Sequence, residues 1–469
     1  MKWILTILLI LSLIAGCLNQ EPPYFERCEP VEPTLSISQG DVIEFSCTAS
    51  DPDTKDLAYV WYVNGERVSD TYWYDFEMEE GTYSVLMEVS DGTSSISRQW
   101  EVEVVNTPDF EKIQSRLEDI RGLLFIAPVQ RVEIDRDQLR AILMESLSED
   151  SEDIALEKRL YVAMHLMDSS VDLYQVYVDM LTTQIASYYD TSDHIFYEVI
   201  DQDAPLIYRE FIAAHEFTHA LQDQYGFLEG EFDNEDAHLA FLCVIEGDAM
   251  FHQYKYLDKM TFKEKKMLFD YVNNLDIPEV NRFLENIMML RYSLGLEFIA
   301  FMSLHDIDSL YDNLPVSSEQ VMHPEKYIMK EEPVTVVIPS LPGWIALDED
   351  VLGEAFIQTM LREHINGKEA GAAAEGWGGD AYGYYERGDT YLYVLNTVWD
   401  TEWDASEFFD AYLLFTRSWS ENHIEEINGY LYKTPAGYLA LVRHGKEVLI
   451  AESPSLDALT EVLSLMVPA

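Results

Sequence analysis

The sequence Phe-Ile-Ala-Ala-His-Glu-Phe-Thr-His-Ala-Leu-Gln-Asp-Gln, residues 211–224, predicts a buried helix near the middle of the chain. In a helix, residues four apart lie one turn above each other on the same face. His215 and His219 can therefore point an imidazole nitrogen at one metal ion, and Glu216 lies beside that face. This geometry is the basis of the HExxH motif, in which the two histidines bind a metal ion and the glutamate reaches a metal-bound water.

The pattern alone is a hypothesis, because three fixed residues arise by chance in about a few per cent of chains of this length. Its alternative is a core helix with two hydrogen-bonded histidines. Catalytic zinc takes three protein ligands and keeps one position open. Glu246, 27 residues after His219 in an apolar helical stretch, can supply the third ligand. Burying a lone carboxylate is costly unless it is paired or bound to a metal, and a buried ion pair is the alternative here.

Other side chains compete for the third ligand position. Glu235, Asp236 and His238 lie in a more polar stretch. Asp223 lies four residues after the second histidine, and a third ligand from one straight helix would not close a tetrahedron. We expect Asp223 and Asp248 instead to lie outside the ligands and to hold them in orientation, without binding the metal themselves. The expected ligands of a Zn²⁺ ion are therefore His215, His219 and Glu246.

The stretches 215–224 and 245–249, the latter reading Ile-Glu-Gly-Asp-Ala, resemble the gluzincin group of zinc peptidases. More closely, the chain is similar to a little-characterised bacterial and archaeal family of predicted extracytoplasmic metallopeptidases. The resemblance covers roughly residues 110–420 and includes three further motifs. These are LTTQIASYYD at 181–190, SSEQVMHPEKY at 317–327 and GWGGD at 376–380.

The resemblance implies a mechanism. Zinc would lower the pKa of its bound water, and Glu216 would take the proton and pass it to the leaving amine. The candidates for stabilising the oxyanion are His323, Tyr292 and Tyr327. His323 is the preferred candidate, because it is expected in a loop, where packing in a helix core does not explain a histidine. The alternative interpretation is that His323 caps a helix or hydrogen-bonds a backbone carbonyl. Many gluzincins carry Glu-x-x-x-Asp on the second helix, whereas Met250 stands at that position here, so the group that orients the ligand histidines stays open.

The first residues indicate a destination outside the cytoplasm. The apolar run Trp3–Ala15 follows Lys2 and, at ~13 residues, is shorter than the ~20 residues that span a bilayer. Such a run is typical of a signal peptide, and Leu13–Cys17 resembles a lipobox. We expect residues 1–17 to be a signal peptide, Cys17 to be lipidated, and the protein to be extracytoplasmic and held at the membrane by this lipid. Ordinary cleavage and an uncleaved anchor are the alternatives.

The charge balance excludes one class of partner. Thirty basic and 86 acidic side chains give a formal net charge of −56, spread along the whole chain. A surface this negative repels nucleic acid and anionic lipid headgroups, so no nucleic-acid partner is expected. A solvated acidic surface in a salty exterior explains the charge better than a cationic partner. The length of 469 residues suggests two to four domains.

Residues 33–106 alternate apolar and polar side chains in short runs, and Asn64–Gly65 is a strong hairpin signal. The pattern predicts a β-sandwich that resembles an immunoglobulin-like domain of the PKD type. Trp61 would lie in its core, and Tyr83 would form a tyrosine corner. The domain is expected to act as a spacer, with a weak binding module as the alternative, on a tether formed by residues 18–32.

The fold class expected for the whole chain is multidomain α+β. A mainly α, zincin-like metallopeptidase domain is expected at 109–345 and an α+β region at 346–469. Residues 109–182 show a helical period, and residues 313–345 are expected to be irregular. Two strands around 185–199 form a predicted hairpin whose edge could bind an extended peptide, with a plain structural hairpin as the alternative.

The C-terminal region and the cysteines add further expectations. A Gly/Ala-rich loop and a structural turn at 376–380 should precede tyrosine-rich strands around 381–398, which should line a half-buried sheet. Cys28 and Cys47 can pair with each other, though the sequence leaves this open. Cys243 is expected to be an inert buried thiol.

The function expected from these residues is zinc-dependent hydrolysis of peptide bonds in a peptide or protein substrate at the cell surface, with Glu216 as general base. Two alternatives stay open. One is a catalytically inactive surface binding or adhesion protein that keeps the fold, and the other is a zinc hydrolase of a non-peptide bond. Retention of the base, Glu216, favours an enzyme.

Overall fold

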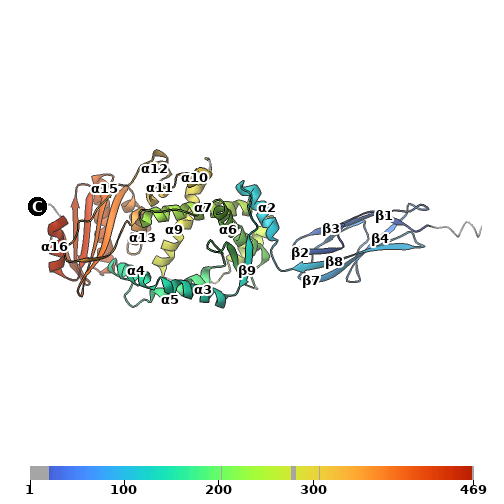
Figure 1. Ribbon diagram of the computed structural model, residues 1–469, viewed down its shortest axis with the longest axis horizontal. Helices are drawn as coiled ribbons and strands as arrows, with labels where there is room; N and C mark the ends of the chain where they lie inside the picture. The colour runs from blue at the N-terminus through green and yellow to red at the C-terminus, as the bar shows by residue number, and fades with distance from the viewer. Residues whose placement is uncertain (1–20, 202, 276–280, 306, 467–469) are drawn as a thin grey trace, which may run out of the picture. The chain divides into compact units, whose positions relative to one another are not determined.

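The computed structural model describes residues 21–201, 203–275, 281–305 and 307–466 (Figure 1). The chain divides into two compact units, an N-terminal unit of residues up to Ile113 with Pro205–Glu210, and a main unit of Gln114–Ala204 with the residues from Phe211 onward. The fold is mixed α/β, with a β-rich N-terminal region followed by helices and further strands. The expected signal peptide and Cys17 lie outside the described residues. Within the described part of the chain, no helix is both long and apolar enough to cross a membrane.

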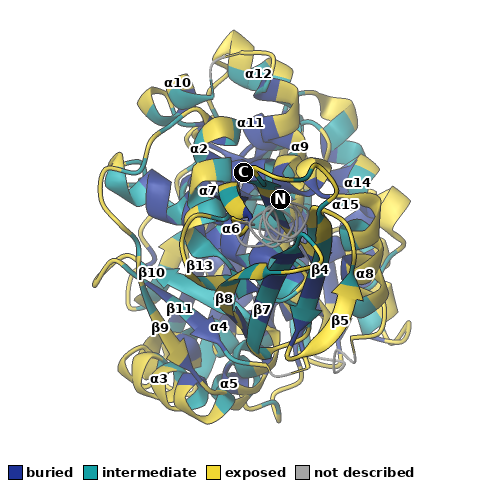
Figure 2. Cartoon of the chain, turned by 90° about the vertical axis from the view of Figure 1, so that its right-hand side faces the viewer, coloured by how far each residue is buried: buried dark blue, intermediate teal, exposed yellow. Residues whose placement is uncertain are grey.

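The N-terminal unit consists of two β-sheets that share one hydrophobic core. One sheet has the order β1-β3-β6, with strands Tyr24–Glu29, Ile43–Ser50 and Trp73–Phe76. The other has the order β2-β8-β7-β4-β5, with strands Thr34–Ser38, Ser95–Val105, Gly81–Ser90, Ala58–Val63 and Glu66–Ser69. In β7 and β8 alternate side chains are buried, as the period-two pattern predicts. The edge strand β5 is mostly exposed (Figure 2).

Large aromatic side chains fill the centre of this core. The ring centroid of Phe45 lies 5.2 Å from that of Trp100 and 6.0 Å from that of Trp61, and all three residues are fully buried. The prediction of Trp61 as a core residue is therefore confirmed. The Tyr83 hydroxyl donates to the Glu79 carbonyl at 3.0 Å, the bond that a tyrosine corner makes.

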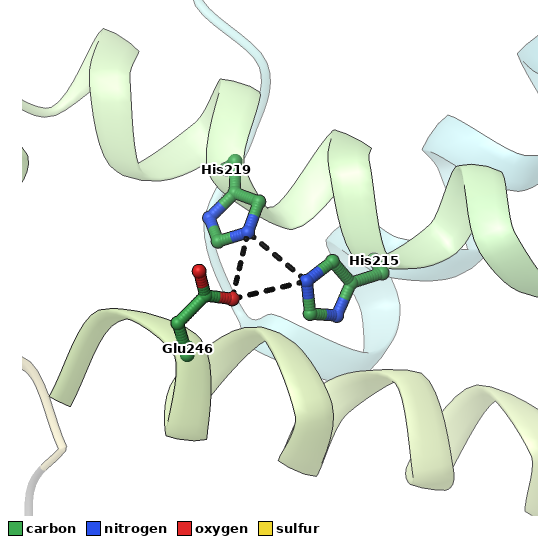
Figure 3. Close-up of side chains that lie close together, drawn as sticks. All are labelled: His215, His219 and Glu246. Carbon is green, nitrogen blue, oxygen red and sulfur yellow. Dashed lines mark hydrogen bonds and ion pairs between the residues drawn. The ribbon is translucent and has the colours of Figure 1, made fainter. Parts of the chain in front are cut away.

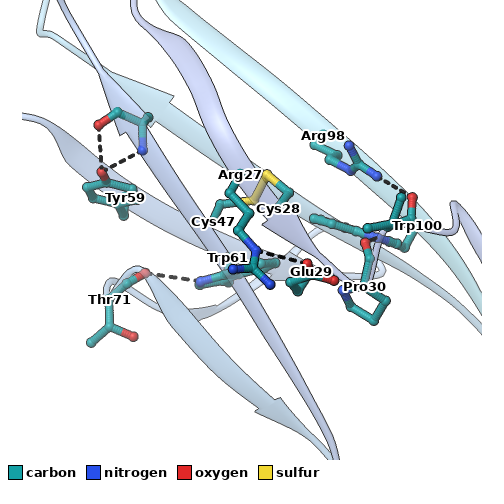
Figure 4. Close-up of a disulfide and its surroundings, with 12 residues drawn as sticks. Arg27, Cys28, Glu29, Pro30, Cys47, Tyr59, Trp61, Thr71, Arg98 and Trp100 are labelled. Atoms are coloured by element: carbon teal, nitrogen blue, oxygen red, sulfur yellow. Dashed lines mark hydrogen bonds and ion pairs between the residues drawn. A yellow bond between two sulfur atoms is a disulfide. The ribbon is translucent and has the colours of Figure 1, made fainter.

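Strand β1 lies in the segment that the sequence assigned to a tether. It pairs antiparallel with β3, and Cys28 stands directly opposite Cys47, to which a disulfide joins it (Figure 4). The strand escaped prediction because Cys28 is the one buried side chain among its six residues, so it shows no alternation.

The first part of the main unit is mostly helical. Its helices, of which α2 and α6 begin in the residue ranges of the N-terminal unit, are α2 (Phe110–Arg121), α3 (Arg136–Glu149), α4 (Ser151–Ala163), α5 (Leu173–Gln184), α6 (Leu206–Gln224), α7 (Glu235–Lys259), α8 (Phe262–Val272), α9 (Arg282–Met302), α10 (Asp308–Asp312), α11 (Ser318–Met322) and α12 (Pro324–Met329). A small sheet has the order β10-β11-β9, with strands Ser187–Asp190, Ile195–Val199 and Gln130–Ile134.

The helical period expected over residues 109–182 is confirmed by α2 to α5. Strand β9, which lies between α2 and α3 and pairs in parallel with β11, was missed. The burial pattern of β9 shows no alternation, so the sequence of β9 does not indicate a strand, and pairing with β11 explains why it forms one. The region 313–345 is not wholly irregular, because α11 and α12 lie within it.

The C-terminal part of the main unit is a seven-stranded antiparallel sheet with helices. The order is β12-β13-β14-β18-β17-β16-β15, with strands Ile345–Asp350, Trp377–Arg387, Thr390–Trp399, Glu447–Ser453, Gly437–His444, Leu431–Thr434 and Glu425–Asn428. The helices are α13 (Gly353–Arg362), α14 (Gly367–Ala374), α15 (Glu402–Trp419) and α16 (Leu456–Met466).

Both faces of this sheet are covered. Tyr393 and Leu395 of β14 belong to a core that includes α13, α14 and α15, whereas Leu392 and Val394 belong to a second core with α16. The expectation of a half-buried sheet was therefore wrong. The expected Gly/Ala-rich loop is largely helix α14, and most of the expected turn at 376–380 is the start of β13.

Candidate metal centre

Helices α6 and α7 carry the predicted ligands and face each other (Figure 3). Phe217 anchors α6 by packing edge-on against Phe196 of β11, with ring centroids 5.3 Å apart. Asn234 begins α7, because its side chain accepts a hydrogen bond from the Ala237 backbone. Local packing and capping thus fix the register of both helices.

The structure brings the three predicted ligands together. The Nε2 atoms of His215 and His219 lie 3.1 Å apart. Glu246 Oε2 lies 3.3 Å from the first of these nitrogens and 3.4 Å from the second. The three side chains keep 12%, 15% and 13% of their surface exposed, so the cluster is largely buried.

The spacing of these atoms fits a divalent metal ion. Ligand atoms at about 2.0–2.2 Å from a tetrahedral zinc ion stand about 3.3 Å from one another. Glu246 Oε2 is buried and has no hydrogen-bond donor of good geometry. A carboxylate oxygen left without a donor between two imidazole nitrogens is costly. A bound cation therefore explains the arrangement better than a hydrogen-bonded cluster does, and two histidines with one glutamate suit zinc.

The two glutamates have opposite pKa shifts. Burial raises the pKa of Glu216, and the neighbouring imidazoles offset only part of this. Burial also opposes the charged form of Glu246, but His219 and His215 outweigh it and lower the pKa of Glu246. The difference follows from position, because Glu246 faces both imidazoles directly whereas burial dominates at Glu216.

The β10–β11 hairpin holds Glu216 and Asp223 in place. The Tyr189 backbone N–H donates to Glu216 Oε2 at 2.9 Å. The Tyr189 hydroxyl donates to Asp223 Oδ2 at 2.7 Å, and His194 Nδ1 lies 2.6 Å from the same oxygen. Asp223, which we expected to support the ligands, thus ties the hairpin to the end of α6.

The three oxyanion candidates lie in different places. Tyr292 of α9 lies beside the cluster, with its ring centroid 6.2 Å from that of His215. Burial, followed by the Glu246 charge, raises the pKa of Tyr292. His323 Nε2 instead lies 3.0 Å from Glu354 Oε1, and Tyr327 donates to the Asn313 carbonyl. Of the three, Tyr292 contacts a predicted ligand.

Behind His219 lies a group that the sequence analysis missed. His219 Nδ1 is 2.8 Å from Gln222 Oε1, and Gln222 Nε2 is 3.2 Å from Asp248 Oδ2. Asp248, which we expected to support the ligands, therefore reaches His219 through Gln222. The spacing of three residues between His219 and Gln222 on one helix was the available signal. No sequence signal indicated Arg121, whose Nε lies 3.2 Å from Asp248 Oδ1.

The rival ligands lie elsewhere. Glu235 Oε2 lies 3.6 Å from His238 Nδ1, and Glu235 is exposed whereas His238 is half-buried. Asp236 is buried, accepts the Ser318 N–H, and lines a cavity of about 450 Å³ together with Asp380 and others. None of the three residues of the metal centre lines this cavity.

A second carboxylate cluster is held by an ammonium group. Glu319, Glu331 and Asp400 could together approach one ion. Lys326 Nζ lies 2.6, 2.9 and 2.8 Å from their carboxylates, respectively. The lysine already supplies the positive charge that this cluster requires.

Comparisons with known proteins add little to this geometry. A family described as a domain of unknown function (DUF8575) matches residues 343–463, the region of the seven-stranded sheet. No curated protein matches the chain. Fibronectin(III)-like modules from Clostridium thermocellum are similar at 18% identity and a TM-score of 0.16, over 18% of this chain and 46% of that chain. An I-band fragment of titin is similar at 17% identity and a TM-score of 0.14, over 25% of this chain and 39% of that chain.

A quinonprotein alcohol dehydrogenase-like protein from Bacteroides thetaiotaomicron is similar at 12% identity and a TM-score of 0.16, over 18% of this chain and 20% of that chain. The chain thus spans less than half the length of each of these proteins. Similarities at such TM-scores carry no argument about the fold or function of this chain.

Proposed function

We propose that this chain is a zinc-dependent peptidase with a mainly α, gluzincin-like domain, in which His215, His219 and Glu246 bind Zn²⁺ and Glu216 is the general base. The observation that carries the proposal is the convergence of three ligand atoms within 3.4 Å of one another, one of them a carboxylate oxygen without a donor. A bound Zn²⁺ ion would supply Lewis acidity and lower the pKa of a water at its open position.

The residues around this point have the properties that peptide hydrolysis requires. Glu216 is buried, with a raised pKa, so it can accept a proton and later donate it to a leaving amine. The Tyr189 N–H holds one of its oxygens and leaves the other available for this transfer. Strand β10 lies at the edge of its sheet, where an extended peptide could add as a further strand.

The remaining parts of the chain fit a role at the cell surface. We propose that the two-sheet N-terminal unit is an immunoglobulin-like spacer of the PKD type, and that lipidation of Cys17 holds the protein outside the cytoplasm. The net charge of −56 is compatible with a solvated exterior surface.

The decisive experiment combines metal content with hydrolysis. Purified wild-type protein, Glu246→Ala and the exposed control Glu297→Ala would be analysed for zinc and assayed on a peptide library with and without chelator. We expect zinc and chelator-sensitive cleavage in the wild type and in Glu297→Ala, and loss of both in folded Glu246→Ala. Unchanged zinc in Glu246→Ala would reject the ligand assignment. Zinc without cleavage would reject the peptidase and favour a binding protein or a hydrolase of another bond.

A further inference from the structure

Gln222 lies on the side of His219 that faces away from the ligand cluster. Its Oε1 is 2.8 Å from His219 Nδ1. Its Nε2 donates to the Ile245 carbonyl at 2.9 Å and lies 3.2 Å from Asp248 Oδ2. Gln222 is 1% exposed, so bulk water does not compete for these bonds.

The partners of Gln222 determine which way its amide points. A backbone carbonyl only accepts hydrogen bonds, so the NH₂ end must face Ile245 and the amide oxygen must face His219. His219 Nδ1 must then carry the hydrogen of that bond. In the neutral imidazole that binds a metal, the Nε2 atom of His219 then keeps its lone pair, on the side that faces Glu246 and His215.

Asp248, on the other side of Gln222, is itself held rigidly. It is fully buried, and it contacts Arg121 Nε at 3.2 Å and His252 Nδ1 at 2.8 Å. The Tyr311 hydroxyl donates to it at 2.7 Å. A buried charged network drawn from α2, α7 and α10 thus ends at Gln222.

We propose that Gln222 is a positioning residue of the metal centre, which holds His219 in the Nδ1–H tautomer and couples it to the buried Asp248–Arg121 pair. This inference rests on the proposed function, since it concerns a ligand of the proposed zinc ion. Many gluzincins have an aspartate where Met250 stands here, so the sequence left open which group orients the ligand histidines. Gln222 takes this role for His219. An amide suits this place, because a carboxylate at position 222 would stand about as close to Asp248 as Gln222 does, at 3.2 Å, and like charges at that distance repel.

The first test uses the wild-type protein loaded with zinc. Long-range ¹H–¹⁵N NMR spectra of labelled histidines distinguish the metal-bound nitrogen from the protonated one. We expect His219 to bind zinc through Nε2 and to carry a slowly exchanging hydrogen on Nδ1. Zinc bound through Nδ1, or a rapidly exchanging Nδ1 hydrogen, would overturn the inference without touching the ligand assignment.

The second test compares two buried glutamines given the same substitution. Gln253 is 4% exposed and donates to the Phe211 carbonyl, so Gln253→Leu removes a buried hydrogen bond between α6 and α7 that involves no predicted ligand. We expect Gln222→Leu to weaken zinc binding by about 10–100-fold in competition with a chromophoric chelator, and Gln253→Leu to leave it unchanged. The visible spectrum of the Co²⁺-loaded protein should change in Gln222→Leu alone. Equal zinc affinity in both variants would overturn the inference.

A charge exchange provides the rescue. Gln222→Glu should weaken zinc binding, because two carboxylates would then face each other, and adding Asp248→Asn should restore part of the affinity. A double variant no better than Gln222→Glu would contradict the proposed coupling. A wild-type protein that binds no zinc would overturn the metal centre together with this inference, whereas the outcomes above concern Gln222 alone.

Discussion

Gly247 of α7 and Gly295 of α9 are in direct backbone contact: a Cβ atom on Gly247 would come 2.3 Å from the carbonyl oxygen of Gly295. A Cβ atom on Gly295 would likewise come 2.2 Å from the carbonyl oxygen of Cys243. Both distances are far below any real contact, so the two helices approach as closely as their backbones allow. The residue that precedes Gly247 is Glu246, so this contact helps to determine where Glu246, the proposed third ligand, lies relative to α6.

Replacing Gly295 with alanine should therefore disturb both stability and the metal centre. We expect Gly295→Ala to lower the free energy of unfolding by about 1–3 kcal/mol, because α9 must move away from α7. Zinc affinity should fall as well, since Glu246 and Tyr292 lie on the two displaced helices. The exposed control Ser293→Ala on the same helix should stay within about 0.5 kcal/mol of the wild type in urea unfolding. Wild-type stability in Gly295→Ala would show that the helices do not meet as described.

The proposed general base gives a prediction that separates metal binding from chemistry. Glu216→Gln keeps the shape of the side chain, and its amide oxygen can still accept the Tyr189 N–H. We expect this variant to bind zinc normally and to lose roughly 10²–10⁴-fold in kcat on a peptide substrate. Glu235→Gln, which changes an exposed rival acid, should keep both zinc and activity. Full activity in Glu216→Gln would remove this residue from the mechanism.

Much of the candidate metal centre was predictable because it depends on local sequence spacing. The four-residue spacing of His215 and His219 places both imidazoles on one face of a helix whatever the rest of the chain does. Glu246 followed from the cost of a carboxylate in an apolar helix, which applies wherever that helix packs. The alternating strands of residues 33–106 were predictable for the same reason, since period two depends only on one buried face.

What the sequence could not show depends on contacts between distant residues. Arg121 reaches Asp248 across 127 positions, and no periodicity reports such a pair. His323 looked free for catalysis because its partner, Glu354, lies 31 residues away on another helix. Strands β1 and β9 lack alternation and are strands because a partner strand lies beside each of them.

The disulfide between β1 and β3 should stabilise the N-terminal unit alone. It closes a loop between cysteines 19 residues apart, for which the loss of chain entropy in the unfolded state predicts roughly 3 kcal/mol. We expect reductant to speed hydrogen exchange in peptides from residues 34–105 of the wild-type protein, while peptides of the main unit stay unchanged. The double variant Cys28→Ala/Cys47→Ala should exchange rapidly with or without reductant. If reductant left the hydrogen-exchange rates of the wild-type peptides 34–105 unchanged, the prediction would be contradicted.

Stability should depend on pH through the buried acids that line the cavity beside the start of α7. Burial, with the nearby Asp380 carboxyl adding to it, raises the pKa of Asp236 to about 8, and burial raises that of Asp380 to about 6. Between about pH 4 and pH 8 the unfolded chain has released the Asp236 proton while the folded chain retains it. The unfolded state then binds fewer protons, so the free energy of unfolding falls as pH rises through this window.

Replacing Asp236 with asparagine removes this titration while keeping an oxygen that can accept the Ser318 N–H. One pKa unit corresponds to about 1.4 kcal/mol. The free energy of unfolding of the wild type should therefore fall by up to roughly 4 kcal/mol between pH 5 and pH 8, whereas that of Asp236→Asn should not show this fall. Urea unfolding at pH 5, 6, 7 and 8 measures this difference. The exposed neighbour Asp233→Asn should follow the wild-type curve, because the side chain at that position is solvated in both states. Parallel curves for wild type and Asp236→Asn would mean that Asp236 is ionised in the folded protein and that its burial is offset by a positive charge.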